Sequence, residues 1–270
     1  MTNAGASETS GGLPHRRSTL GRIGVGLGVL SLGLVALGAV LAKAGVLSPM
    51  SGFLTSTLGA ATAALFGLIA GLIALVLAFR AKPRLGLRGP TVAVALSGLL
   101  LAVYLAWASG AQRQPPIHDV ATDWSDPLTP SGELLSARGP RTNAVEPAPA
   151  IAANSRAKGF AGQTVAEINA RTCPGAAPVV RAEPVDRAFT KARDAVKAAG
   201  LTIVTDQPAQ GRLEATATSG WYGFKDDLIV RVRPEAAGAR IDMRSISRLG
   251  VSDLGVNCNR VSRLRQALAG

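Results

Sequence analysis

Three long runs of apolar residues in the first 110 positions constrain this chain more than any other feature. They cover residues 21–42, 53–79 and 91–108, and Arg22, at the edge of the first run, is the only charge in them. About 20 helical residues cross a hydrocarbon core about 30 Å thick, so the runs suit membrane spans. Buried helices of a soluble protein are the alternative, but three such runs would leave no polar face toward water. The sequence therefore predicts three transmembrane helices within residues 21–110.

Lys and Arg near the ends of the runs predict the orientation. Cations are retained on the cytoplasmic side of a membrane, which places the N-terminus inside and the C-terminal part outside the cytoplasm. We thus expect a multi-pass protein of the inner (cytoplasmic) membrane. One side holds seven cations and the other two. The seven are Arg16, Arg17, Arg22, Arg80, Lys82, Arg84 and Arg88, and the two are Lys43 and Arg113.

The residues around the Arg16-Arg17 pair also resemble a twin-arginine export signal, although the apolar run is long for one. Cleavage there would remove the first helix and leave the C-terminal part on the same side. The runs contain no Asp, Glu, His or Lys, which argues against a transporter, channel or proton relay.

Small residues recur at four-residue spacing in two of the predicted spans. Gly24 and Gly28 form one GxxxG pattern, and Gly67 and Gly71 form another. Glycines allow two helix backbones to approach closely, so the second helix is expected to pack against the first or against another copy. The alternative is that glycine is simply frequent in membrane helices.

The C-terminal part changes to alternating helical and extended patterns. Apolar residues at three- and four-residue spacing predict helices over residues 183–200 and 257–268, the second with Asn257 as N-cap. Period-two segments at 201–205, 212–219, 227–233 and 239–247 predict strands. The fold class is a three-span α-helical membrane region followed by an α+β domain, whose antiparallel sheet is covered by helices on one face.

The composition of the remaining segments sets the expected boundaries. Residues 1–20 are predicted to form a disordered tail, and residues 21–110 the membrane region. The Pro- and Ala-rich residues 111–160 predict a tether, or a segment laid on the next domain. The α+β domain is then expected over residues 161–270.

The PEAAG turn between the last two strands predicts a hairpin and its register. If Arg233 faces Arg240, then Arg231 faces Asp242, and both pairs share a face with Arg244. Two interpretations stay open for this face. It is a solvated polar surface, or a shallow anion-binding surface for a phosphate, carboxylate or lipid headgroup.

The polar loop before the last helix extends the second interpretation, because helix N-termini favour anions. Asp253 and Asn257 would equally serve to cap and brace this turn. The candidate ligand-binding residues from the strands and the loop are Arg231, Arg233, Arg244, Ser245, Arg248, Ser252 and Asp253.

The two cysteines, Cys173 and Cys258, both lie in the part expected outside the cytoplasm. In an oxidising compartment a pair is compatible with one disulfide, and two separate buried thiols are the alternative. Two cysteines without paired histidines are too few for a zinc site, and no metal or cofactor is predicted. His118, beside Asp119, is the one candidate base, but no nucleophile motif accompanies it.

The last 50 residues resemble a bacterial family known as domain of unknown function family fourteen ninety-nine, in its membrane-anchored type. The resemblance rests on GFKDD (223–227), VRVR (230–233), DMRS (242–245), SDLG (252–255) and Asn257, with PPIHDVATDWSDP (115–127) upstream. It implies a small α/β domain at the cell envelope, and it implies no reaction. Residues 163–178 depart from the pattern, because they lack the Tyr-Pro stretch that many members carry.

No residue pattern points to a reaction, so the leading hypothesis is a non-enzymatic role. The external domain would bind an envelope protein, a wall component or a lipid headgroup, with the bilayer itself as the other partner. The alternatives are an envelope hydrolase or transferase using His118 with an Asp, and an accessory subunit of a transport or envelope-biogenesis complex. The net charge of +12 lies mainly near the spans, where it suits anionic lipid. Nucleic-acid binding is not expected, because aromatic residues are only 4% and no groove helix is evident.

Overall fold

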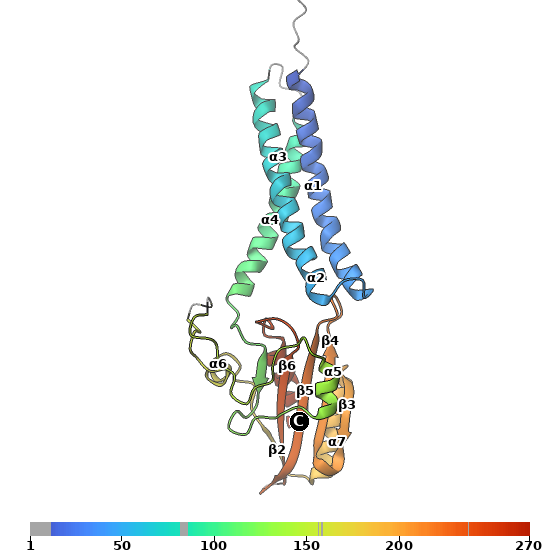
Figure 1. Cartoon of the computed structure of the whole chain (residues 1–270), viewed down its shortest axis with the longest axis vertical. Coiled ribbons are helices and arrows are strands. Elements are labelled where there is room, and N and C mark those ends of the chain that lie inside the picture. Colours follow the sequence, from blue (N-terminus) through green and yellow to red (C-terminus); the bar gives the residue numbers. More distant parts are fainter. Residues whose placement is uncertain (1–11, 82–85, 156, 158, 237) are drawn as a thin grey trace, which may run out of the picture. The chain divides into compact units, whose positions relative to one another are not determined.

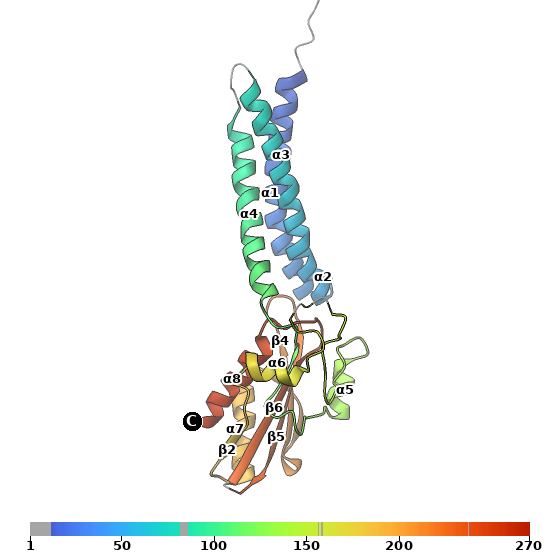
Figure 2. The same cartoon turned by 90° about the vertical axis from the view of Figure 1, so that its left-hand side faces the viewer.

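The computed structural model describes residues 12–81, 86–155, 157, 159–236 and 238–270. The chain divides after Gly110 into two compact units, a helical unit and a C-terminal domain (Figures 1 and 2). Residues 111–160 group with the C-terminal domain, which agrees with the second of the two alternatives, a segment laid on the domain, and not with a separate tether. The first helix already begins at Gly12, so the predicted tail does not extend to residue 20. Residues 1–11 of that tail, and the orientation charges Lys82 and Arg84, lie outside the described residues.

The described residues of the helical unit contain three candidate membrane spans, as predicted. They cover Thr19–Lys43, Pro49–Arg80 and Arg88–Gln112, and each is long and apolar enough to cross a bilayer. This supports a membrane protein. The second span is continuous through a π-helical turn, in which each hydrogen bond is one residue longer than in an α-helix. Its elements are α1 (Gly12–Lys43), α2 (Pro49–Leu54), the π-helical turn (Thr55–Gly59), α3 (Ala60–Arg80) and α4 (Arg88–Gln112).

The four glycines of the GxxxG patterns lie where the helices of this unit approach one another. A Cβ atom added to Gly24 would lie 2.8 Å from the Cβ of Ala93 in α4 and 3.1 Å from the carbonyl oxygen of Gly67 in α3. One on Gly28 would lie 2.8 Å from Leu96 of α4, and one on Gly71 would lie 3.0 Å from Ala93. Side chains at these positions would push the helices apart, so the small residues serve packing within one chain.

The C-terminal domain is built on one antiparallel sheet. The strand order is β1-β6-β5-β4-β3, and β2 pairs with the same edge of β6 as β1 does. The strands are β1 (Asp119–Ala121), β2 (Val179–Arg181), β3 (Thr202–Gln207), β4 (Arg212–Thr218), β5 (Lys225–Glu235) and β6 (Gly238–Ser247). The helices are α5 (Gly132–Arg138), α6 (Val165–Thr172), α7 (Val185–Ala198), the 3-10 turn Pro208–Gln210 and α8 (Val256–Ala269). The predicted hairpin register is confirmed, because Arg231 pairs with Asp242 and Arg233 with Arg240.

One face of the sheet carries the main apolar core. Side chains on alternate strand positions, such as Leu228, Val230 and Met243, pack against α7 and α8 and are fully buried. Phe189 and Val261 are the corresponding buried residues of the two helices. This face was predicted from the period-two pattern, and burial of its apolar side chains is the main favourable contribution to folding of the domain.

The second face is covered as well, which the sequence did not predict. Residues 122–146, with α5, lie over it, and a second small core forms from Leu128, Leu134, Ile229 and Ile246. The hairpin side chains expected in solvent are therefore buried, with Asp242 1% and Arg244 0% exposed. The expectation of a solvent-facing polar surface was wrong for these two residues.

The two cysteines are joined in a disulfide. Cys173, directly after α6, is bonded to Cys258 in the first turn of α8, and the two lie 85 residues apart in the chain. The bond connects the irregular segment after α6 to a helix of the main core. A crosslink of this kind restricts the unfolded chain more strongly the longer the loop it closes.

Removing the disulfide should destabilise the domain substantially. We expect the double substitution Cys173→Ser/Cys258→Ser to lower the free energy of unfolding by about 4 kcal/mol, from the entropy of closing the long loop. Pulse proteolysis of the full chain in urea, scored on cleavage of the domain, measures this. Wild-type protein treated with dithiothreitol should match the variant, and an unchanged midpoint in both would contradict the role given to the bond.

Candidate functional site

The arginines predicted to bind an anion on the hairpin are held by carboxylates of the same domain. Arg231 and Arg233 both contact Asp126 at 3.0 Å, and they reach Asp242 at 3.0 and 3.4 Å. Arg240 donates to the second oxygen of Asp242 at 2.9 Å. Asp242 thus carries three guanidinium partners while almost fully buried, and each of these cations is already neutralised.

Arg244 and Asp119 form a buried bidentate ion pair. Arg244 donates through Nε at 3.0 Å and Nη2 at 2.6 Å to the two oxygens of Asp119. It also donates to the backbone carbonyls of Leu128 and Glu146, and its guanidinium stacks 5.0 Å from the ring of Trp124. Burial raises the pKa of Asp119 above its usual value, and the hydrogen bonds and charge of Arg244 oppose that rise.

Arg248 takes part in a second buried cluster. Asp227 accepts hydrogen bonds from Arg248 at 2.7 and 2.9 Å and from Arg138 of α5 at 2.6 Å. Thr216 donates to the same carboxylate at 2.8 Å. Arg138 and Arg248 also donate to backbone carbonyls of the covering segment, at Asn143 and Ala137. Every member of the cluster has partners, which is the condition for burying charge without a large penalty.

The polar face therefore forms a closed network within the described residues. Each of its seven arginines makes an ion pair with a carboxylate of the domain, so an external anion would have to compete with these carboxylates. This pairing argues against the interpretation of this face as an anion-binding surface. The seven are Arg138, Arg212, Arg231, Arg233, Arg240, Arg244 and Arg248.

The remaining predicted residues hold the loop between β6 and α8. Ser245 donates to Asn257 at 2.7 Å, and Ser252 donates to the carbonyl of Pro115 at 2.9 Å. Asp253 accepts from the backbone amides of Gly255 and Asn257 at 2.9 and 2.8 Å. Asp253, and not Asn257, therefore satisfies the N-terminal amides of α8. Burial raises the pKa of Asp253, and these two amide hydrogen bonds counteract the increase.

His118 has no catalytic surroundings in the described part of the chain. Its Nδ1 lies 3.4 Å from the carbonyl oxygen of Val251, and no Ser or Cys side chain hydrogen-bonds to it. The neighbouring Asp119 is occupied by Arg244. The described residues also contain no group of three or more His, Cys, Asp or Glu side chains able to hold a metal ion.

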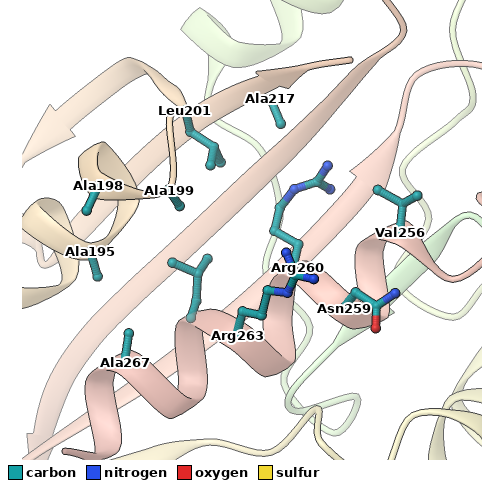
Figure 3. A pocket seen from close by; sticks show the side chains of 11 residues that line it. Ala195, Ala198, Ala199, Leu201, Ala217, Val256, Asn259, Arg260, Arg263 and Ala267 are labelled. Atoms are coloured by element: carbon teal, nitrogen blue, oxygen red, sulfur yellow. The ribbon is translucent and has the colours of Figure 1, made fainter. Parts of the chain in front are cut away.

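A groove on the helical side of the domain is the best candidate for a ligand site (Figure 3). It has a volume of about 650 Å³, within the range of about 300–1,000 Å³ typical of ligand pockets. It lies between the end of α7 and one side of α8. Its lining is largely small and apolar, and consists of Ala195, Ala198, Ala199, Leu201, Ala217, Val256, Asn259, Arg260, Arg263, Leu264 and Ala267.

The two arginines of the groove differ in their partners. Arg260 donates to Asp226 at 2.7 Å and to Ser245 and Asn257, so it is tied to the sheet. Arg263 is exposed and makes no ion pair or side-chain hydrogen bond among the described residues. The groove thus offers an apolar floor and one uncommitted positive charge.

Sequence reasoning missed this site. The alanines of α7 look like an ordinary good helix-forming sequence, and their position opposite α8 depends on tertiary packing. The available signal was Arg263, which lies near the apolar stripe of the last helix without a carboxylate three or four positions away.

Family comparison gives one match. The model of the family described as "Protein of unknown function (DUF1499)" matches residues 120–268, more than half of the chain. The chain belongs to this family. No curated protein and no solved structure shows a significant match. The DUF1499 match begins in β1 and ends in α8, so it includes the covering segment, the Asp227 cluster and the groove, while Asp119 lies one residue before it.

The buried cluster around Asp227 should be essential for stability. We expect Asp227→Ala to lower the free energy of unfolding by about 3–5 kcal/mol, because two guanidinium groups remain buried without their counter-ion. Asp206→Ala is the matched control, since Asp206 pairs with Arg193 at the surface, where such pairs contribute about 0–1 kcal/mol. Urea midpoints of the full chain, read by proteolysis of the domain, compare the two. Equal losses would show that the covering segment does not depend on this cluster.

Proposed function

We propose that the protein is a membrane-anchored, non-enzymatic binding domain of the cell envelope that holds a single-chain anionic amphiphile, such as a fatty acid, in the α7–α8 groove. The observation that carries this proposal is the pairing of an alanine-lined apolar floor with the unpaired cation of Arg263. A hydrocarbon chain gains from apolar contact alone, and its carboxylate or phosphate accepts charge-assisted hydrogen bonds from a guanidinium.

A peptide ligand fits these features less well. An extended peptide needs partners for its backbone amides and carbonyls, usually from an open sheet edge. The groove lies between two helices, whose backbone groups are already bonded, and only Asn259 among its uncharged side chains is polar. A polymethylene chain makes no such demand, which favours a lipid-like occupant.

We further propose that the domain lies outside the cytoplasm and that the membrane is the inner one. The distribution of Lys and Arg around the spans supports this orientation. The Cys173–Cys258 disulfide is independent support, because such bonds persist in oxidising compartments and are rare in the cytosol.

A reporter fusion tests the orientation. Alkaline phosphatase, which is active only outside the cytoplasm, should be active when fused after Gly270, and green fluorescent protein at the same point should stay dark if exported unfolded. The complementary pattern, with an inactive phosphatase and a bright fluorescent protein, would overturn the proposed location.

Substitutions in the groove test the ligand. We expect Ala267→Trp, which fills the groove, to abolish binding of a fluorescent fatty acid to the full chain in nanodiscs. Arg263→Gln should weaken binding by about tenfold or more, because a hydrogen bond to a charged group contributes about 1.5–3 kcal/mol. Displacement by unlabelled palmitate, with the signal of empty nanodiscs subtracted, measures the affinity.

Two exposed neighbours provide matched controls. Gln266→Trp places the same side chain on α8 outside the groove lining, and Arg187→Gln removes an exposed cation of α7 that does not line it. Both should bind as the wild type does. Equal binding by wild type and Ala267→Trp would refute the groove as the site, and equal loss in the test and control variants would refute the specificity.

A further inference from the structure

Two loops lie side by side at one end of the sheet. The first, residues 219–224, joins β4 to β5, and the second, residues 248–255, joins β6 to α8. The backbone amide of Arg248 donates to the carbonyl of Lys225 at 3.0 Å, which connects the two where they leave the sheet. These two loops together are called the tip.

The tip exposes large apolar side chains to an unusual degree. Trp221 is 76% exposed, Val251 73% and Leu254 41%. Tyr222 and Phe224 contact each other with ring centroids 6.1 Å apart, and both are half-buried beside Trp221. Large apolar side chains exposed together on neighbouring loops indicate an interaction site.

The loops hold these side chains outward in a fixed arrangement. In the first loop, the backbone amide of Ser219 donates to the carbonyl of Phe224 at 2.8 Å, and the amide of Phe224 donates to the hydroxyl of Ser219 at 2.9 Å. These two hydrogen bonds close the turn that bears Trp221. In the second loop, Leu254 has a φ of 55°, a left-handed conformation that is costly for a residue with a Cβ atom.

The covalent chain keeps the second loop near the end of a membrane span. Ser252 bonds to the carbonyl of Pro115, and the amide of Asp253 donates to the carbonyl of Ile117 at 3.0 Å. Pro115 is the third residue after Gln112, where α4 ends. Three extended residues span at most about 11 Å, so Pro115 lies within that distance of the end of α4. The second loop is hydrogen-bonded to Pro115 and is therefore held near the end of the span.

We propose that the tip is a membrane-docking surface, with Trp221, Val251 and Leu254 inserted at the boundary between lipid headgroups and hydrocarbon. Trp is enriched in this layer because its ring is apolar and its N–H remains hydrated. The exposed cations Lys225 and Arg113 flank the tip and suit anionic headgroups. The short chain to the span makes the bilayer the surface most constantly within reach.

The three inserted side chains of the tip do not line the groove, although the groove begins directly after the second loop. Val256, the first residue of α8, is 47% exposed and lines the groove directly after the second loop. A docked tip would therefore present the groove opening to the lipid surface. Trp221 and Val251 do not line the groove, so substitutions there test membrane docking separately from ligand binding.

Site-specific quenching tests the docking. Val251→Cys, labelled with the fluorophore NBD in the full chain, is reconstituted in nanodiscs of phosphatidylcholine and phosphatidylglycerol with or without doxyl-labelled lipid. Val180→Cys is the matched control, since Val180 is 52% exposed on β2 and pairs with the opposite end of β6. We expect the Val251 probe to lose most of its emission to the doxyl lipid and the Val180 probe to keep it.

A second substitution separates insertion from mere proximity. Trp221→Ser in the Val251→Cys background should reduce the quenching, because the aromatic anchor of the neighbouring loop is removed. Quenching of Val251 no stronger than that of Val180 would overturn the proposal. A blue-shifted NBD emission without doxyl quenching would also overturn it, since it would mean that a protein surface covers the tip.

Discussion

The buried ion pairs on the covered face of the sheet are the interaction on which the rest of the domain depends. Asp119 holds Arg244 from one edge, and Arg138 of α5 shares Asp227 with Arg248. These contacts close over a sheet face that would otherwise expose a row of charges. Removing one partner of such a cluster leaves a buried charge unpaired, so the segment and the strands require each other.

This closure determines where a ligand can bind. The arginines that make the hairpin look like an anion site are paired with carboxylates of the fold, several of which are shared between two or three arginines. The other side of the sheet is covered by α7 and α8, which do not close completely and leave the groove. Arg263 there keeps its charge free, in contrast to Arg260, which is bonded to Asp226. The proposed lipid ligand follows from this difference between two arginines one turn apart.

The sequence predicted what local patterns determine and missed what distant pairing determines. The spans, the strands and the pairing of Arg231 with Asp242 follow from hydropathy, period-two alternation and one short turn. The burial of Arg244 could not be predicted in this way, because its partner Asp119 is 125 residues away. Prolines in residues 111–160 indicated an extended chain, either a tether or a segment laid on the domain, and no local signal showed which face of the sheet this chain would cover. The groove was missed for the same reason, since its walls come from two separate helices.

Photo-crosslinking can locate a lipid held on the helical side of the domain. A fatty acid that carries a diazirine near its chain end would be incubated with the full chain in nanodiscs, irradiated, and the labelled domain peptides mapped by mass spectrometry. If the groove holds the lipid, we expect labels within residues 195–201 and 256–267 that unlabelled palmitate competes away. Labels confined to the membrane spans, or to the covering segment over the charged face of the sheet, would contradict it.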